Sequence, residues 1–194
     1  MIPHSLRQAV RLVAILNLAY FGIECAVALS IGSVSLFADS IDFLEDASVN
    51  FLVLAALAWS ARARARVGML LAAILLVPGL ATLWMAWHKF MLPVPPAPLP
   101  LSLTGLGAFV VNLSCAVMLV RFRHHGGSLS RAAFLSARND ALANIAIVAA
   151  AGVTVPFPSA WPDLIVGLAI AALNAGAARE VYGAARAEQA EALP

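Results

Sequence analysis

The chain has 194 residues, of which 62% are hydrophobic and only 11% are charged, and its formal net charge is +2. A soluble domain of this size needs more charge to cover its surface, so the composition excludes a soluble globular protein. The mean hydropathy is +0.92. We therefore predict an integral membrane protein whose surroundings are a lipid bilayer, and we expect no nucleic-acid partner.

The apolar runs accommodate six transmembrane helices, because one span needs about 20 residues and the loops between the runs are short. We expect an all-α bundle with spans near residues 9–29, 34–58, 67–88, 101–120, 131–152 and 163–182. The six-helix transmembrane domain is expected to cover residues 1–186. Residues 187–194 are expected to form a short cytoplasmic tail, with no C-terminal soluble domain.

Positive charges cluster at alternate ends of these spans, and such clusters mark the cytoplasmic side. They are Arg7 and Arg11; Arg62, Arg64 and Arg66; Arg121, Arg123 and Arg131; and Arg179 and Arg186. The opposite loops contain only Lys89, and the longest of them is a proline-rich stretch, residues 93–100, which we interpret as a stiff spacer. Both termini are therefore predicted to be cytoplasmic, in an inner or plasma membrane.

The first span contains polar residues on one face, Asn17, Tyr20 and Glu24. Because more spans follow at once, we interpret this run as a retained helix rather than a secretory signal. Two roles remain open for Glu24: it is either a proton carrier or a group that pairs helices within the membrane.

The second span contains three aspartates, Asp39, Asp42 and Asp46, within about 60° of arc around the helix. A charged side chain at mid-bilayer costs about 2.5 to 3.5 kcal/mol, so such residues are typical of functional sites. Asp42 and Asp46 are four residues apart and share a helix face. Two carboxylates at this spacing are suited to a divalent cation or to a proton relay.

The fifth span repeats part of this pattern. Asp46-Ala47-x-x-Asn50 in the second span corresponds to Asp140-Ala141-x-x-Asn144 in the fifth. These two helices run in opposite directions on the predicted topology, as in an inverted repeat of three helices each. Such repeats place the substrate site between them near the midplane of the membrane.

Aligning the two halves places Ser136 at the position that Asp42 occupies in the second span. We therefore predict a metal site formed by Asp42, Asp46, Asp140 and Ser136. Three further residues are expected to serve as reserve ligands or to support the ligands. They are Asn50, Asn144 and Asp39.

Several of these motifs resemble the transmembrane domain of the cation diffusion facilitator family, along nearly the whole chain. Residues 33–40, SVSLFADS, look like the family's opening of the second helix, and Asp42 and Asp46 occupy its His-or-Asp-xxx-Asp ligand pair. Asp140 matches the final acid of the fifth-helix pair. Residues 161–167, WPDLIVG, resemble the acid-led start of the sixth helix.

The resemblance implies a homodimer that exports a divalent metal against proton influx by alternating access. It also implies that the first, second, fourth and fifth helices form the ion-binding bundle, while the third and sixth stand aside. Two features depart from the family. Ser136 stands where the family usually has His or Asp, and the usual cytoplasmic C-terminal domain is not expected here.

With no histidine, the predicted ligands are all oxygen atoms. Such a set favours Mn²⁺, Fe²⁺ or Mg²⁺ over Zn²⁺, although Zn²⁺ and Co²⁺ also accept carboxylates. The resemblance implies that the metal is a transported substrate, exchanged for protons, and no permanently bound cofactor is expected. The alternative function is a non-transporting, degenerate relative with a structural or accessory role. An intramembrane enzyme is not expected, because no second catalytic motif accompanies the aspartates.

Overall fold

The computed structural model describes residues 4–56, 79–120 and 127–173, and within these ranges it contains six helical segments and no strand. The helices are α1 (His4–Ile31), α2 (Val34–Ala56), α4 (Pro98–Val120), α5 (Gly127–Thr154), a segment over residues 79–91 and the helix Trp161–Leu173. Each of these segments overlaps one of the six predicted spans. The predicted all-α class is confirmed.

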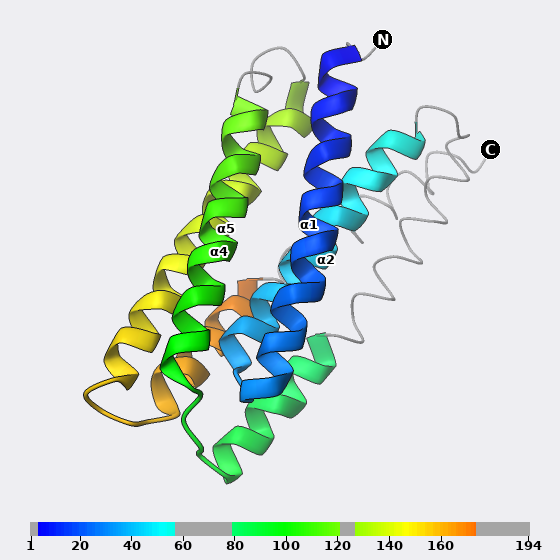
Figure 1. Cartoon of the computed structure of the whole chain (residues 1–194). Helices are drawn as coiled ribbons and strands as arrows, with labels where there is room; N and C mark the ends of the chain where they lie inside the picture. The colour runs from blue at the N-terminus through cyan, green and yellow to red at the C-terminus, as the bar shows by residue number, and fades with distance from the viewer. Residues whose placement is uncertain (1–3, 57–78, 121–126, 174–194) are drawn as a thin grey trace, which may run out of the picture.

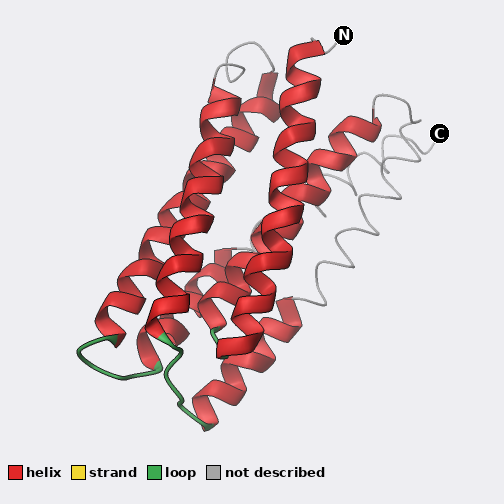
Figure 2. Cartoon of the chain, in the orientation of Figure 1, coloured by secondary structure: helices red, strands yellow, loops and turns green. Residues whose placement is uncertain are grey.

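The helices run roughly side by side as a bundle, with the N-terminus at one end (Figure 1). α1 packs against α2 and α4 packs against α5, and α1 also contacts α4. The α1–α2 turn and the connections over residues 92–97 and 155–160 all lie at the opposite end from the N-terminus (Figure 2). The two helix pairs therefore face each other across the interior of the bundle.

α4 begins earlier than the sequence predicts. The backbone N–H of Leu101 donates to the Ala97 carbonyl at 3.2 Å, and Pro98 is the first helical residue. Proline is suited to this position, because its fixed φ matches a helix and its missing N–H would have no partner there. The proline-rich spacer is therefore shorter than expected, since residues 98–100 form the first turn of α4.

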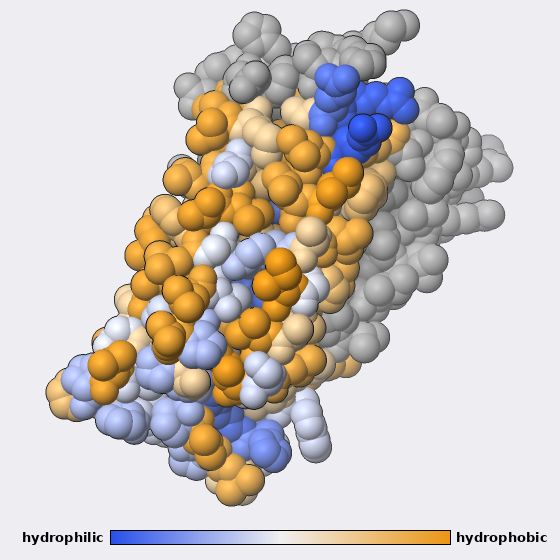
Figure 3. All heavy atoms as spheres, viewed as in Figure 1, coloured by the Kyte–Doolittle hydropathy of each residue, from blue (hydrophilic) through white to orange (hydrophobic). Residues whose placement is uncertain are grey.

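The outer surface of the bundle is apolar. On α4 the exposed large residues recur every three or four positions, which is one face of a helix. They are Leu99, Leu103, Leu106, Val110, Leu113 and Val117. Hydrophobic surface covers much of the face shown in Figure 3, and hydrophilic atoms gather at the N-terminal end of α1. Leu6–Ile31 and Pro98–Val120 are long and apolar enough to cross a membrane.

Two consecutive residues, Gly32 and Ser33, form the turn between α1 and α2. Gly32 has a φ of 62°, a left-handed conformation that glycine adopts without steric cost. The Ser33 N–H donates to the Ala28 carbonyl at 2.9 Å, which closes α1 as a Schellman motif. The Ser33 hydroxyl then accepts from the Leu36 N–H at 3.2 Å and caps α2.

The start of α2 is held by a carboxylate from elsewhere in the chain, Asp163. This side chain is fully buried and accepts four hydrogen bonds from the first residues of α2. The donors are the Ser33 and Ser35 hydroxyls at 2.6 Å each and the Val34 and Ser35 N–H groups at 2.9 and 3.2 Å. A carboxylate at a helix N-terminus also compensates the positive end of the helix dipole.

Lys89 completes this arrangement from the segment 79–91. Its ammonium group donates to Asp163 at 2.8 Å and to the Gly32 carbonyl at 2.6 Å, and its side chain is only 6% exposed. We call Gly32, Lys89, Asp163 and residues 33–35 the α1–α2 joint. The joint connects four helical segments at one end of the bundle. Lys89, which the sequence placed in a loop, is therefore a buried structural residue.

Gly167 lets the helix Trp161–Leu173 approach this joint closely. A Cβ at residue 167 would lie 2.7 Å from the Val34 carbonyl carbon and 2.8 Å from the Ser35 nitrogen. Backbone atoms cannot move aside easily, so only glycine fits. The absence of a side chain at this position sets the distance between the two helices.

Candidate metal centre

The acidic residues of α2 point into the bundle rather than toward lipid. Asp39 is fully buried and Glu45 is nearly so, while Asp42 and Asp46 are partly buried. The spacing of these residues, at i, i+3 and i+7, places Asp39, Asp42 and Asp46 on the face that α2 turns toward its neighbours. The polar residues therefore lie inside a bundle with an apolar exterior, which is typical of membrane proteins that handle ions.

Asp42 lies close to an acid from a different helix, Asp140 on α5. The carboxylate of Asp140 acts electrostatically on Asp42, as do those of Asp39, Asp46 and Glu45 on its own helix. These two residues come from the two halves that the sequence pattern relates. Asp42 and Asp140, which are 98 positions apart in the sequence, therefore interact across the interior of the bundle.

Asp46 is positioned by the first helix. The Asn17 amide on α1 donates to the Asp46 carboxylate at 3.4 Å, and the Cys115 thiol on α4 donates to the Asn17 carbonyl oxygen at 3.7 Å. Asn17 and Cys115 are both buried. Three helices therefore contribute to fixing this carboxylate, and Cys115 is part of the polar interior as well as a small core residue.

The two asparagines of the repeated pattern make the same hydrogen bond. The Asn50 amide donates to the Asp46 backbone carbonyl at 2.7 Å, and the Asn144 amide donates to the Asp140 backbone carbonyl at 2.5 Å. In each case the asparagine bonds four residues back, to the aspartate of its own motif. α2 and α5 thus correspond in this local hydrogen bond as well as in sequence.

The fourth predicted ligand, Ser136, belongs to α5, but its side chain lies outside the part of the chain that the structure describes. Among the described residues, no three His, Cys, Asp or Glu side chains converge closely enough to hold a metal ion. Asp42, Asp46 and Asp140 are therefore near one another without forming a closed set of ligands. Their role as ligands stays a prediction.

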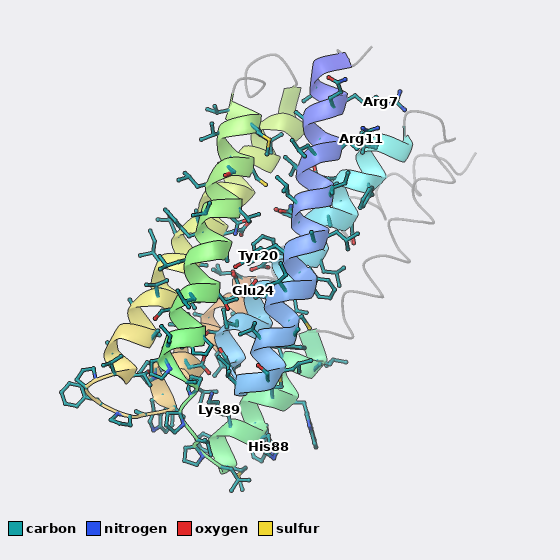
Figure 4. All side chains as sticks on the ribbon, in the orientation of Figure 1. Arg7, Arg11, Tyr20, Glu24, His88 and Lys89 are labelled. Atoms are coloured by element: carbon teal, nitrogen blue, oxygen red, sulfur yellow. The ribbon has the colours of Figure 1, made fainter. Side chains whose placement is uncertain are left out.

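A second group of polar residues lies nearer the α1–α2 joint. Glu24 on α1 and Asp39 on α2 are neighbours, and the Asn144 amide on α5 donates to Asp39 at 3.3 Å. Figure 4 shows Glu24 and Tyr20 projecting from α1 into the bundle, whereas Arg7 and Arg11 lie near its N-terminal end. The sequence indicated the face on which Glu24 lies but not these partners.

Tyr20 closes this group on the side of α4. Its hydroxyl donates to the Thr104 backbone carbonyl at 2.7 Å, and its ring packs directly over Gly107, where a Cβ would collide with it. The ring also contacts Phe43 on α2, with centroids 5.1 Å apart. Tyr20 therefore separates the buried carboxylates from the apolar surroundings of α4.

These features define a class of protein: a helical membrane protein with an apolar outer surface and an acidic interior suited to cations. Residues 10–182 match the family model of the cation efflux transmembrane domain, so the chain belongs to the cation diffusion facilitator family. Cation transport across a membrane is the activity of this family. No curated protein matches the chain.

Proposed function

We propose that the protein exports a divalent metal cation across the inner or plasma membrane in exchange for protons, by alternating access. One observation supports the proposal: the Asp140 carboxylate on α5 acts electrostatically on Asp42 of α2 inside the bundle. The α5 residue belongs to the half of the chain that repeats the Asp-Ala-x-x-Asn pattern of α2.

The exchange follows from the charge of the site. Asp42, Asp46 and Asp140 are like charges in a medium of low dielectric constant, so cations must compensate them. Either a metal ion or protons can do so, and metal binding then releases protons. Since the predicted ligands are oxygen atoms, Mn²⁺, Fe²⁺ and Mg²⁺ are the preferred substrates, with Co²⁺ and Zn²⁺ as weaker ones.

The same proposal includes the topology. Residues 1–186 form six spans with both termini in the cytoplasm, and residues 187–194 form the tail. The two halves are inverted repeats, which the matching Asn50 and Asn144 hydrogen bonds support. The protein works as a homodimer, without enzymatic activity.

Proteoliposomes that contain a trapped pH indicator test the exchange. With Mn²⁺ added outside, the wild type is expected to move protons out of the vesicles as the metal enters. Asp46→Asn and Asp140→Asn are expected to abolish this flux, because each removes a charged ligand while keeping the side-chain size. Glu45→Gln is the matched control: it neutralises another buried carboxylate of α2 that is outside the predicted ligand set, and should retain coupled flux.

Wild-type coupling in both aspartate variants would contradict the proposed centre. A wild type that binds Mn²⁺ but moves neither metal nor protons would instead favour the non-transporting alternative.

A further inference from the structure

Glu24, Asp39 and Asn144 form a buried polar cluster that contains none of the four predicted ligands, although Asp39 and Asn144 are expected as reserve ligands of that site. They come from three different helices, α1, α2 and α5, and each side chain is 0% exposed. The carboxylates of Glu24 and Asp39 are near enough to act on each other electrostatically. Asn144 links the pair to α5 through its hydrogen bond to Asp39.

This cluster has oxygen acceptors that no donor satisfies. Within the described residues, four of its buried oxygen atoms accept no hydrogen bond: both Glu24 carboxylate oxygens, Asp39 Oδ2 and Asn144 Oδ1. A buried acceptor without a partner costs about 1 to 3 kcal/mol, and more when it is charged. An ionised carboxylate accepts hydrogen bonds and donates none, so two facing carboxylates satisfy each other only if one of them is protonated, and then through a single hydrogen bond.

No described cation compensates the two charges. Lys89 is not available to the cluster, because its ammonium group is bonded to Asp163 and to the Gly32 carbonyl. Arg11 is 13 residues before Glu24, or about 20 Å along the helix axis at 1.5 Å per residue. The hydroxyl of Tyr20 is directed to the Thr104 carbonyl.

We propose that Glu24, Asp39 and Asn144 form a second cation site, which binds a divalent ion through oxygen ligands. One divalent ion neutralises the two carboxylates and offers coordination to all four unsatisfied oxygens. A single shared proton would satisfy only two of them. Oxygen ligands of this kind suit hard ions such as Mn²⁺ and Mg²⁺.

The second site is separate from the predicted transport centre but lies on the same row of acids. Asp39 precedes Asp46 by seven residues, which corresponds to about 10 Å along α2. Asp42 lies between them and interacts electrostatically with both Glu24 and Asp39. The second site is thus the position nearer the α1–α2 joint, and its occupancy does not require that the protein transports metal.

The test is the number of Mn²⁺ ions that each purified full-length chain binds, measured by calorimetry and by electron paramagnetic resonance. The wild type is expected to bind two ions per chain. Glu24→Gln and Asp39→Asn, which both keep side-chain size, are each expected to lose one of them. Asp140→Asn is expected to lose the other and to keep the ion at Glu24. Glu45→Gln, the control, should bind two.

The outcomes separate this site from the transport centre. A single bound ion that Glu24→Gln removes and Asp140→Asn keeps would support the second site and count against the proposed transport centre. A single ion that Asp140→Asn abolishes would overturn the second site, and this result does not depend on how the Glu24 variant folds. Wild-type stoichiometry in Glu24→Gln and Asp39→Asn would also overturn it, since the cluster would then hold no metal.

Discussion

In the proposed transport centre, the residue at position 136 would decide which atoms are offered to a metal. Asp42, Asp46 and Asp140 would supply only oxygen, and Ser136 would add a neutral hydroxyl. A hydroxyl is a weak ligand for a divalent ion, so the charge of the site rests on the three carboxylates. Selectivity should therefore respond strongly to a change at this single position.

Ser136→His is predicted to shift the metal preference toward Zn²⁺. Imidazole nitrogen suits Zn²⁺ better than Mn²⁺, so the ratio of Zn²⁺ to Mn²⁺ affinity should rise about tenfold or more. Competition binding between the two ions measures this ratio. Ser114→His is the control, because Ser114 is an exposed residue of α4, and it should leave the ratio unchanged. An unchanged ratio in Ser136→His would show that residue 136 does not belong to the site.

At the level of helices, the α1–α2 joint explains how the first residues of α2 reach a fixed position. Asp163 and Lys89 come from outside the α1–α2 pair, and they bind backbone groups at the end of α1 and the start of α2. The position of Asp39 follows from this, since it lies only five residues after Val34. The segment 79–91 and the helix Trp161–Leu173 thus support α1 and α2.

Gly167→Ala is predicted to destabilise the protein, because its Cβ would lie 2.7 Å from the Val34 backbone. We expect a cost of about 1 to 3 kcal/mol from overpacking, seen as a lower midpoint of thermal unfolding in detergent. Gly152→Ala is the matched control, since a Cβ there meets nothing within 4 Å. That variant should be neutral or slightly more stable, because alanine favours a helix. Equal midpoints for the two variants would contradict the close packing at the joint.

At the scale of the whole molecule, the two ends of the helix bundle differ in a way that indicates its orientation in the membrane. The described connections over residues 92–97 and 155–160 lie with the α1–α2 turn at one end, and Arg7 and Arg11 lie at the other (Figures 1 and 4). Near the joint the Trp87 ring stacks on Phe90 with centroids 6.2 Å apart, and Phe90 meets Trp161 edge to face with centroids 5.9 Å apart. Aromatic residues are enriched where helices meet the membrane surface.

Cysteine labelling tests the proposed orientation. Cys25 and Cys115 are first replaced by alanine, and Val94→Cys, Val155→Cys or Arg7→Cys is then introduced. Val94 and Val155 are 70% and 68% exposed. An impermeant maleimide added to intact cells should label residues 94 and 155 but not residue 7. Labelling of residue 7 alone would show that the protein has the opposite orientation.

The sequence predicted the helical class and the family because both depend on composition and on motifs within single helices. The proximity of Asp42 to Asp140 was also expected from the repeat. The partners of Glu24 could not be predicted, because helix periodicity indicates which face a residue occupies but not which residue faces it. Lys89 and Asp163 are 74 residues apart, and only the isolation of one lysine in an apolar region hinted at a buried pair.

The pairing of Lys89 has a consequence for the chemistry of the whole interior. Because this ammonium group is already bound to Asp163, it does not supply a fixed cation to Glu24 or Asp39. Under the proposed function, the interior would act as a small ion-exchange resin, with immobile anions and mobile counter-ions. Cations in such a material can be substituted for one another but not simply removed, so the proposal requires that uptake of one ion releases another.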